Sequence, residues 1–146
     1  MQRSWCRALL AAAFVLAAGS GVSAATSVSI ESAAPGSSAA PGPTVVFVHD
    51  LAVPASGATV TVCARAHGMS APTKLATAFI VGSRNLTGTR NHAFRQIVDA
   101  PANVLDALAR DPHATITLIV TPTGHPEAAK TVGPYAVSFV HRAGPN

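Results

Sequence analysis

Alternation of apolar and polar residues is the main pattern in this chain, and it predicts β-strands. The clearest run is residues 58–66, where valine and alanine alternate with threonine, cysteine and arginine. One face of such a strand packs inward while the other meets water, which is typical of an antiparallel sheet. Five further runs are rich in β-branched and apolar residues and have the length of strands: residues 44–49, 75–81, 93–98, 114–121 and 134–140.

One segment breaks this pattern and predicts a short helix between residues 100 and 110. Asp99 is the predicted N-cap, Pro101 suits the first turn, and the helix ends before Asp111 and the proline that follows it. Its apolar stripe consists of Val104, Leu105 and Leu108. The whole series predicts an antiparallel β-sandwich, or a partly open barrel, of about six strands with one short helix before the penultimate strand.

The first residues have the features of a secretory signal peptide. Arg3 and Arg7 precede an apolar run over residues 8–18, and Val22 and Ala24 fit the positions before a cleavage site. The run is short for a membrane span, and no later segment approaches about 18 uninterrupted apolar residues. We therefore expect residues 1–24 to be removed, the protein to be exported to the periplasm or beyond, and no membrane span to remain.

The composition divides the rest of the chain into a spacer, one domain and a short tail. Residues 25–43 are rich in alanine, serine, proline and glycine and carry a single charge, Glu31. Such a segment has little apolar surface to bury, so it is predicted to be a flexible linker. The predicted β-sandwich domain then spans residues 44–141, and residues 142–146 form a tail.

Charge and cysteine content exclude several classes of protein. The chain has ten Lys and Arg residues against six Asp and Glu. The basic residues are dispersed and do not alternate with aromatic ones, so no nucleic-acid partner is expected. The chain has two cysteines, and Cys6 would leave with the signal peptide. Cys63 is then alone, so no internal disulfide is predicted, and the sequence leaves its reactivity open.

Cys63, His67 and Met69 raise the question of a copper site, because thiolate, imidazole and thioether are ligands that copper prefers. On one extended strand, however, Cys63 and His67 would stand roughly 13 Å apart, so the three weak candidates would hold one ion only if the strand broke near Arg65. His67 and Met69 remain weak metal candidates at a strand end, joined by another histidine of the domain. The possible third ligands are His92, His113, His125 and His141.

The sequence predicts no catalytic residues. It contains no Gly-x-Ser-x-Gly elbow, and no serine stands in a recognisable nucleophile context. Its six carboxylates are scattered rather than paired, and it has neither a phosphate-binding loop nor a Cys-x-x-Cys motif. We therefore expect a protein that is not an enzyme.

The order of the segments resembles a known family. Residues 45–66 (VVFVHDLAVPASGATVTVCARA) and 75–83 (LATAFIVGS) are followed by the helix segment 97–109 (IVDAPANVLDALA), then by 114–124 (ATITLIVTPTG) and 131–140 (TVGPYAVSFV). This series resembles the C-terminal β-sandwich domain that follows the dicopper domain of tyrosinases and polyphenol oxidases. The family's copper-binding helices and their histidines have no counterpart here, so no site residue is carried over.

The resemblance implies a binding role rather than catalysis. In that family the β-sandwich packs over the dicopper domain and can cover its entrance. The favoured hypothesis is a non-catalytic exported domain that binds or shields a protein partner such as a separately encoded, tyrosinase-like copper oxidase. A periplasmic copper-binding carrier is the first alternative. A structural or surface adhesion module that offers a free strand edge is the second.

Overall fold

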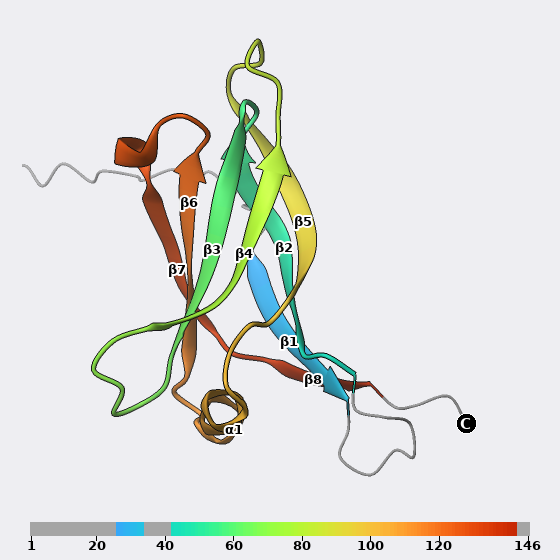
Figure 1. Ribbon diagram of the computed structural model, residues 1–146, viewed down its shortest axis with the longest axis vertical. Coiled ribbons are helices and arrows are strands. Elements are labelled where there is room, and N and C mark those ends of the chain that lie inside the picture. Colours follow the sequence, from blue (N-terminus) through green and yellow to red (C-terminus); the bar gives the residue numbers. More distant parts are fainter. Residues whose placement is uncertain (1–25, 34–41, 143–146) are drawn as a thin grey trace, which may run out of the picture.

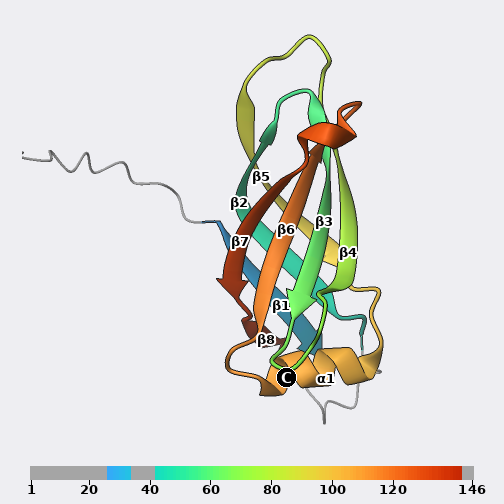
Figure 2. The ribbon, with the colours of Figure 1, turned by 90° about the vertical axis from the view of Figure 1, so that its left-hand side faces the viewer.

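The computed structural model describes residues 26–33 and 42–142, which form two facing β-sheets and one α-helix (Figures 1 and 2). This confirms the predicted β-sandwich. The strands are β1 (Ser27–Ala33), β2 (Val45–Pro54), β3 (Gly57–Arg65), β4 (Thr73–Val81), β5 (Thr89–Ile97), β6 (Thr115–Pro122), β7 (Lys130–Ala136) and β8 (Phe139–Arg142). The predicted signal peptide, 1–24, lies outside the described residues.

Each sheet has four strands. Sheet A has the order β5-β2-β1-β8, and sheet B has the order β4-β3-β6-β7. All neighbouring strands are antiparallel except β1 and β8, which run parallel with Ile30 opposite Phe139. The outermost strands are β5 and β8 in sheet A and β4 and β7 in sheet B, so they carry the edges of the sandwich.

The core lies between the sheets and follows from the alternation in the sequence. On β3 the valines face inward and are fully buried, while the threonines between them face outward. Apolar side chains of β2 and β6 meet them from the two sheets, and no polar side chain is buried among the described residues. The largest buried side chains are Ile30, Leu51, Leu75, Leu108, Ile116 and Leu118.

The predicted linker over 25–43 is wrong for its first part. Ser27–Ala33 forms β1, which pairs antiparallel with β2 from Ser27 opposite His49 to Glu31 opposite Val45. Val28 and Ile30 are buried in the core. Val28 and Ile30 alternate with polar residues only briefly, within a segment rich in alanine and serine, so the composition gave no clear signal for a strand. β1 is stabilised by pairing with β2 on one side and with β8 on the other. The sandwich therefore includes β1, which lies before the predicted start of the domain at residue 44.

The last predicted strand, over 134–140, is split in two. The chain pairs with β6 along β7 in sheet B and then crosses to sheet A, where β8 pairs with β1. Two backbone hydrogen bonds fix the crossing, from Val137 N–H to the Ala114 carbonyl (3.3 Å) and from Ile30 N–H to the Ser138 carbonyl (2.5 Å). The described residues consequently contain eight strands, where about six were predicted.

The helix α1 (Ala102–Arg110) lies between β5 and β6 and covers one end of the sandwich, called here the helix end (Figure 2). Leu108 is buried, and Val104 and Leu105 pack against the core, which confirms the predicted stripe. The predicted N-cap at Asp99 is wrong, because Pro101 occupies the cap position without a side-chain hydrogen bond. Asp99 instead donates its backbone N–H to the Leu75 carbonyl (2.7 Å) and ties this connection to β4.

No helix within the described residues is long and apolar enough to cross a membrane.

Candidate functional site

Cys63 lies on β3, away from the loop that carries the other two copper candidates. Its half-buried side chain is on the outer face of sheet B, between Lys74 of β4 and Thr117 of β6. Burial raises the pKa of the Cys63 thiol, and the nearby charge of Lys74 offsets part of this effect. Because metals and electrophiles react with the thiolate, the raised pKa disfavours Cys63 as a ligand or a nucleophile.

His67 and Met69 lie in the turn that follows β3. The backbone N–H of Met69 donates to the Ala66 carbonyl (3.2 Å), and the Ala66 N–H donates back to the Met69 thioether (3.4 Å). Gly68 between them has a φ of 81°, which favours glycine because it lacks a Cβ. The turn therefore holds the thioether against the end of β3.

Asp111 joins this turn to the connection between α1 and β6. Its carboxylate accepts hydrogen bonds from two backbone N–H groups, that of His67 through Oδ2 and that of His113 through Oδ1 (2.8 Å). These two bonds lower the pKa of Asp111. The sequence predicted Asp111 only as the end of the helix. Its contact with His67 crosses 44 positions of the chain and has no local signal.

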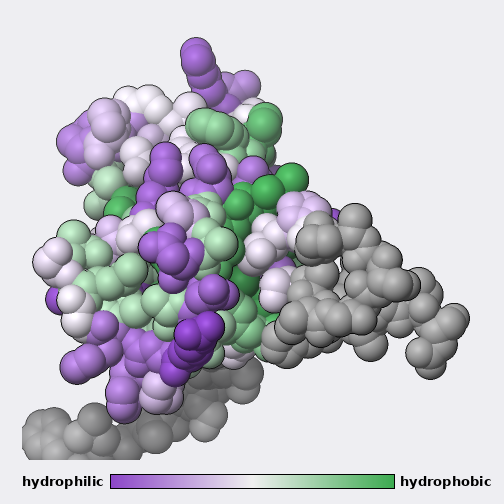
Figure 3. Space-filling view, turned by 60° about the horizontal axis from the view of Figure 1, so that its bottom comes forward, coloured by the Kyte–Doolittle hydropathy of each residue, from purple (hydrophilic) through white to green (hydrophobic). Residues whose placement is uncertain are grey.

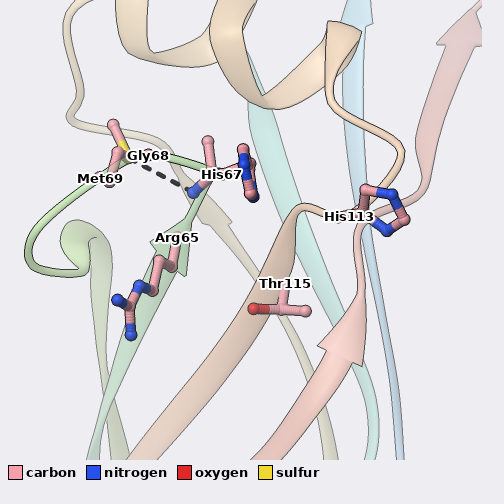
Figure 4. Close-up of a pocket in the computed structure, with 7 residues that line it drawn as sticks. Arg65, His67, Gly68, Met69, His113 and Thr115 are labelled. Atoms are coloured by element: carbon pink, nitrogen blue, oxygen red, sulfur yellow. Dashed lines mark hydrogen bonds between the residues drawn. The ribbon is translucent and has the colours of Figure 1, made fainter.

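A cleft of about 410 Å³ opens between these two connections at the helix end (Figure 4). Four polar residues line it, from three parts of the fold: Arg65 at the end of β3, His67 in the turn, and His113 and Thr115 at and just before the start of β6. The guanidinium of Arg65 points away from the two imidazoles (Figure 4). Met69 lines it as well. Seen from this end (Figure 3), hydrophilic residues gather on the surface with hydrophobic ones between them.

The cleft brings together two of the three predicted copper candidates. His67 and Met69 line it with His113, while Cys63 does not. Within residues 26–33 and 42–142, no three His, Cys, Asp or Glu side chains converge to hold a metal ion. The guanidinium of Arg65 in the same lining adds a positive charge that disfavours a cation.

Two of the other histidines named as possible third ligands, His92 and His125, do not line the cleft. His92 is half-buried on β5, and His141 belongs to β8. His125 lies beside the short 3-10 helix η1 (Pro126–Ala128), where its Nδ1 is 3.1 Å from Oε1 of Glu127. The hydrogen bond from its own backbone N–H lowers the pKa of Glu127 most, and the interaction with His125 lowers it further.

A second feature lies on the sandwich edge formed by β4. Phe79 is 79% exposed and Val81 is 91% exposed, more than any other large hydrophobic side chain of the described residues. Both lie on the outer face of sheet B, with Phe79 opposite Thr59 and Val81 opposite Gly57 on β3. No described strand pairs with the other side of β4.

The other three edges carry features that hinder pairing with a foreign strand. Natural sheets protect their edges with charged residues, with proline and with short strands. The β5 edge has the exposed Arg90 and Arg95, and the β7 edge has the exposed Lys130 and Pro134. β8 is only four residues long. Residues 76–81 of β4 contain neither a charge nor a proline.

A scan against known protein families, a search of curated proteins and a search of solved structures each found no match to this chain.

Proposed function

We propose that this chain is a non-catalytic, exported β-sandwich that binds a protein partner along the free edge of β4. The observation that supports this proposal is the combination of an unprotected strand edge with the exposed side chains of Phe79 and Val81. Large apolar side chains gathered at one exposed place are typical of an interaction site.

The backbone of β4 is oriented for such pairing. On β3, Gly57 directs its carbonyl to the β6 side, where it accepts the Thr123 N–H (3.0 Å), and therefore away from its β4 partner Val81. Directly opposite residues of an antiparallel pair either face each other or both face away, and this direction alternates along each strand, so Val81, Phe79 and Thr77 direct their N–H and C=O groups away from β3. An extended segment added here would form main-chain hydrogen bonds with these three residues.

Side-chain contacts would give the added strand its specificity. Phe79 and Val81 share the outer face of sheet B, so they form one apolar surface beside the open hydrogen-bonding groups. In β-augmentation, main-chain bonds supply affinity and alternate side chains supply selectivity. The fitting partner is a protein with an extended apolar segment.

The resemblance of the segment order to the tyrosinase C-terminal domain suggests the class of partner. That resemblance favours an exported, tyrosinase-like copper oxidase, which the domain would bind or shield. The histidine and methionine residues of the helix end would have no part in this binding, because β4 exposes its apolar surface through Phe79 and Val81 at the opposite end of that strand.

Binding assays with edge variants test the proposal. The full chain is titrated with an exported, tyrosinase-like copper oxidase, first as wild type and then as Val81→Lys or Phe79→Ser. We expect each edge variant to weaken binding at least about tenfold, because a charge or the loss of the apolar anchor removes an exposed contact. Both side chains are exposed, so thermal unfolding should stay near that of the wild type.

The matched control is Ile97→Lys, which places the same charge on an exposed hydrophobic residue of the β5 edge. This variant should bind as the wild type does. Equal loss in Val81→Lys and Ile97→Lys, or unchanged binding in both β4 variants, would contradict a site at β4. Absence of binding by the wild-type chain would exclude the oxidase as the partner.

A further inference from the structure

A second cleft, called here the apolar groove, lies between the two sheets at the end of the sandwich opposite α1, where η1 stands (Figures 1 and 2). Its volume is about 380 Å³. β2 and β5 line it from sheet A, and β6, β7 and η1 line it from the side of sheet B. Six of its eight lining residues are alanine, valine or proline. Small-molecule sites in proteins have about 300–1,000 Å³ and a mainly apolar lining with a few polar groups, so the groove has the size and composition of such a site.

The apolar groove is open because β1 covers only the first half of β2. β1 pairs with residues Val45–His49 of β2, whereas β2 continues to Pro54. Beyond His49, no strand of the described residues pairs with β2 on the side of β1. Ala52, which lines the groove from this second half of β2, is exposed. A ligand can therefore reach the apolar side chains of β6 and β7 from this side.

Lys130 is the one charged residue of this lining. It lies opposite Val120 on β6, as Val132 lies opposite Leu118, and both of these β6 residues are buried in the core. Directly opposite residues of paired strands project to the same face of a sheet, so Lys130 and Val132 project to the inner face of sheet B. Lys130 is exposed and Val132 is half-buried, so the charge lies at the mouth of the groove with the apolar lining behind it.

The charge of Lys130 is available to a ligand. Within the described part of the chain, Lys130 forms no ion pair. Glu127, the carboxylate closest to it in the sequence, accepts its own backbone N–H and interacts with Nδ1 of His125 (3.1 Å). The hydroxyl of Thr89 in the same lining adds a hydrogen-bond donor. The polar part of the groove therefore favours an anionic group and disfavours a cationic one.

We propose that the apolar groove binds a small amphipathic acid of the fatty-acid class, with its hydrocarbon part between the sheets and its carboxylate at Lys130. Removal of the hydrocarbon surface from water supplies most of the affinity. The ion pair with Lys130 sets the orientation of the ligand and favours acids over alcohols. β7 and β4 are opposite edges of sheet B, so the proposal does not depend on partner binding along β4.

An NMR titration of the ¹⁵N-labelled full chain with sodium octanoate, below its micelle-forming concentration and at constant ionic strength, tests this proposal. We expect saturable shifts of the amide signals of residues 52–53, 120–121 and 128–132. Octanol has the same chain without the charge and should bind about threefold more weakly, the effect of an exposed ion pair. Acetate has the charge without the chain and should cause no saturable shift. Absence of saturation with octanoate, or equal affinity for octanoate and octanol, would overturn the proposal.

Two variants place the ligand in the groove. Ala52 is exposed, so in Ala52→Trp the larger side chain should fill the groove without disturbing the core and should abolish saturation by octanoate. Ala93→Trp is its control, at an exposed position of β5 outside the groove, and should bind as the wild type does. Lys130→Gln should bind octanoate as weakly as the wild type binds octanol, whereas Lys74→Gln, at an exposed lysine of β4, should leave the dissociation constant unchanged. Unchanged binding in Ala52→Trp or in Lys130→Gln would contradict the site.

Sedimentation of the free chain separates a small ligand from a second copy in the groove. The sedimentation coefficient should be independent of concentration and the same in Ala52→Trp and the wild type. An oligomer that dissociates in Ala52→Trp would show that a second copy occupies the groove, and it would overturn the proposal.

Discussion

Asp111 shows how much of the helix end depends on a single side chain. Its carboxylate links the turn after β3 to the connection before β6 through two backbone hydrogen bonds. Both hydrogen bonds favour the charged form, and the pKa of Asp111 is lowered as a result. A group with a lowered folded pKa stabilises the protein above its unfolded pKa, about 3.9 for aspartate. This stabilisation disappears as the pH falls through the lower, folded pKa.

Asp111→Ala should therefore lower the melting temperature at pH 7, and the difference from wild type should shrink as the pH approaches 3. Amide hydrogen exchange at His67 and His113 should accelerate in this variant, because both N–H groups lose their acceptor. Asp106→Ala, which removes an exposed carboxylate from α1, is the control and should change neither quantity. A pH-independent loss of stability in Asp111→Ala would contradict the role of its charge.

At the scale of elements, α1 is held against the end of the sandwich mainly by one buried residue. Leu108 is 1% exposed and is the only fully buried side chain of the helix. Replacing a buried leucine by alanine removes apolar contacts and leaves a cavity. The docking of α1 onto the helix end thus depends mainly on this position.

Leu108→Ala should lower the free energy of unfolding by about 2–4 kcal/mol, as measured in urea. Leu86→Ala makes the same chemical change at a leucine that is 37% exposed in the connection after β4, and it should cost far less. If the two variants lose equal stability, or if Leu108→Ala is neutral, α1 is not docked through its apolar stripe.

Local pattern predicted most elements, and long-range pairing decided the rest. The alternation along β3 and the stripe of α1 can be read from a few consecutive residues, and both were predicted. In the local sequence, only Val28 and Ile30 indicate β1. The strand is stabilised by pairing with β2 and β8, which belong to other parts of the chain. The cleft at the helix end likewise depends on contacts between segments that are far apart in the sequence. His67 was a candidate from the sequence, but its neighbours Asp111 and His113 follow from tertiary structure.

At the scale of the whole molecule, the four sheet edges differ in how they meet the solvent. Charged residues, proline or short length protect β5, β7 and β8. Residues 76–81 of β4 have none of these features, and they expose Phe79 and Val81. The features of the helix end lie apart from this edge.

Hydrogen exchange at individual amides of β4 tests binding along this edge most directly. In the free protein, the N–H groups of Thr77, Phe79 and Val81 should exchange rapidly, whereas Ala78 and Ile80 should be protected by pairing with β3. Saturation with the copper oxidase should slow exchange at Thr77, Phe79 and Val81 and leave Ala78 and Ile80 unchanged. Binding without new protection at these three amides would contradict an interface on β4.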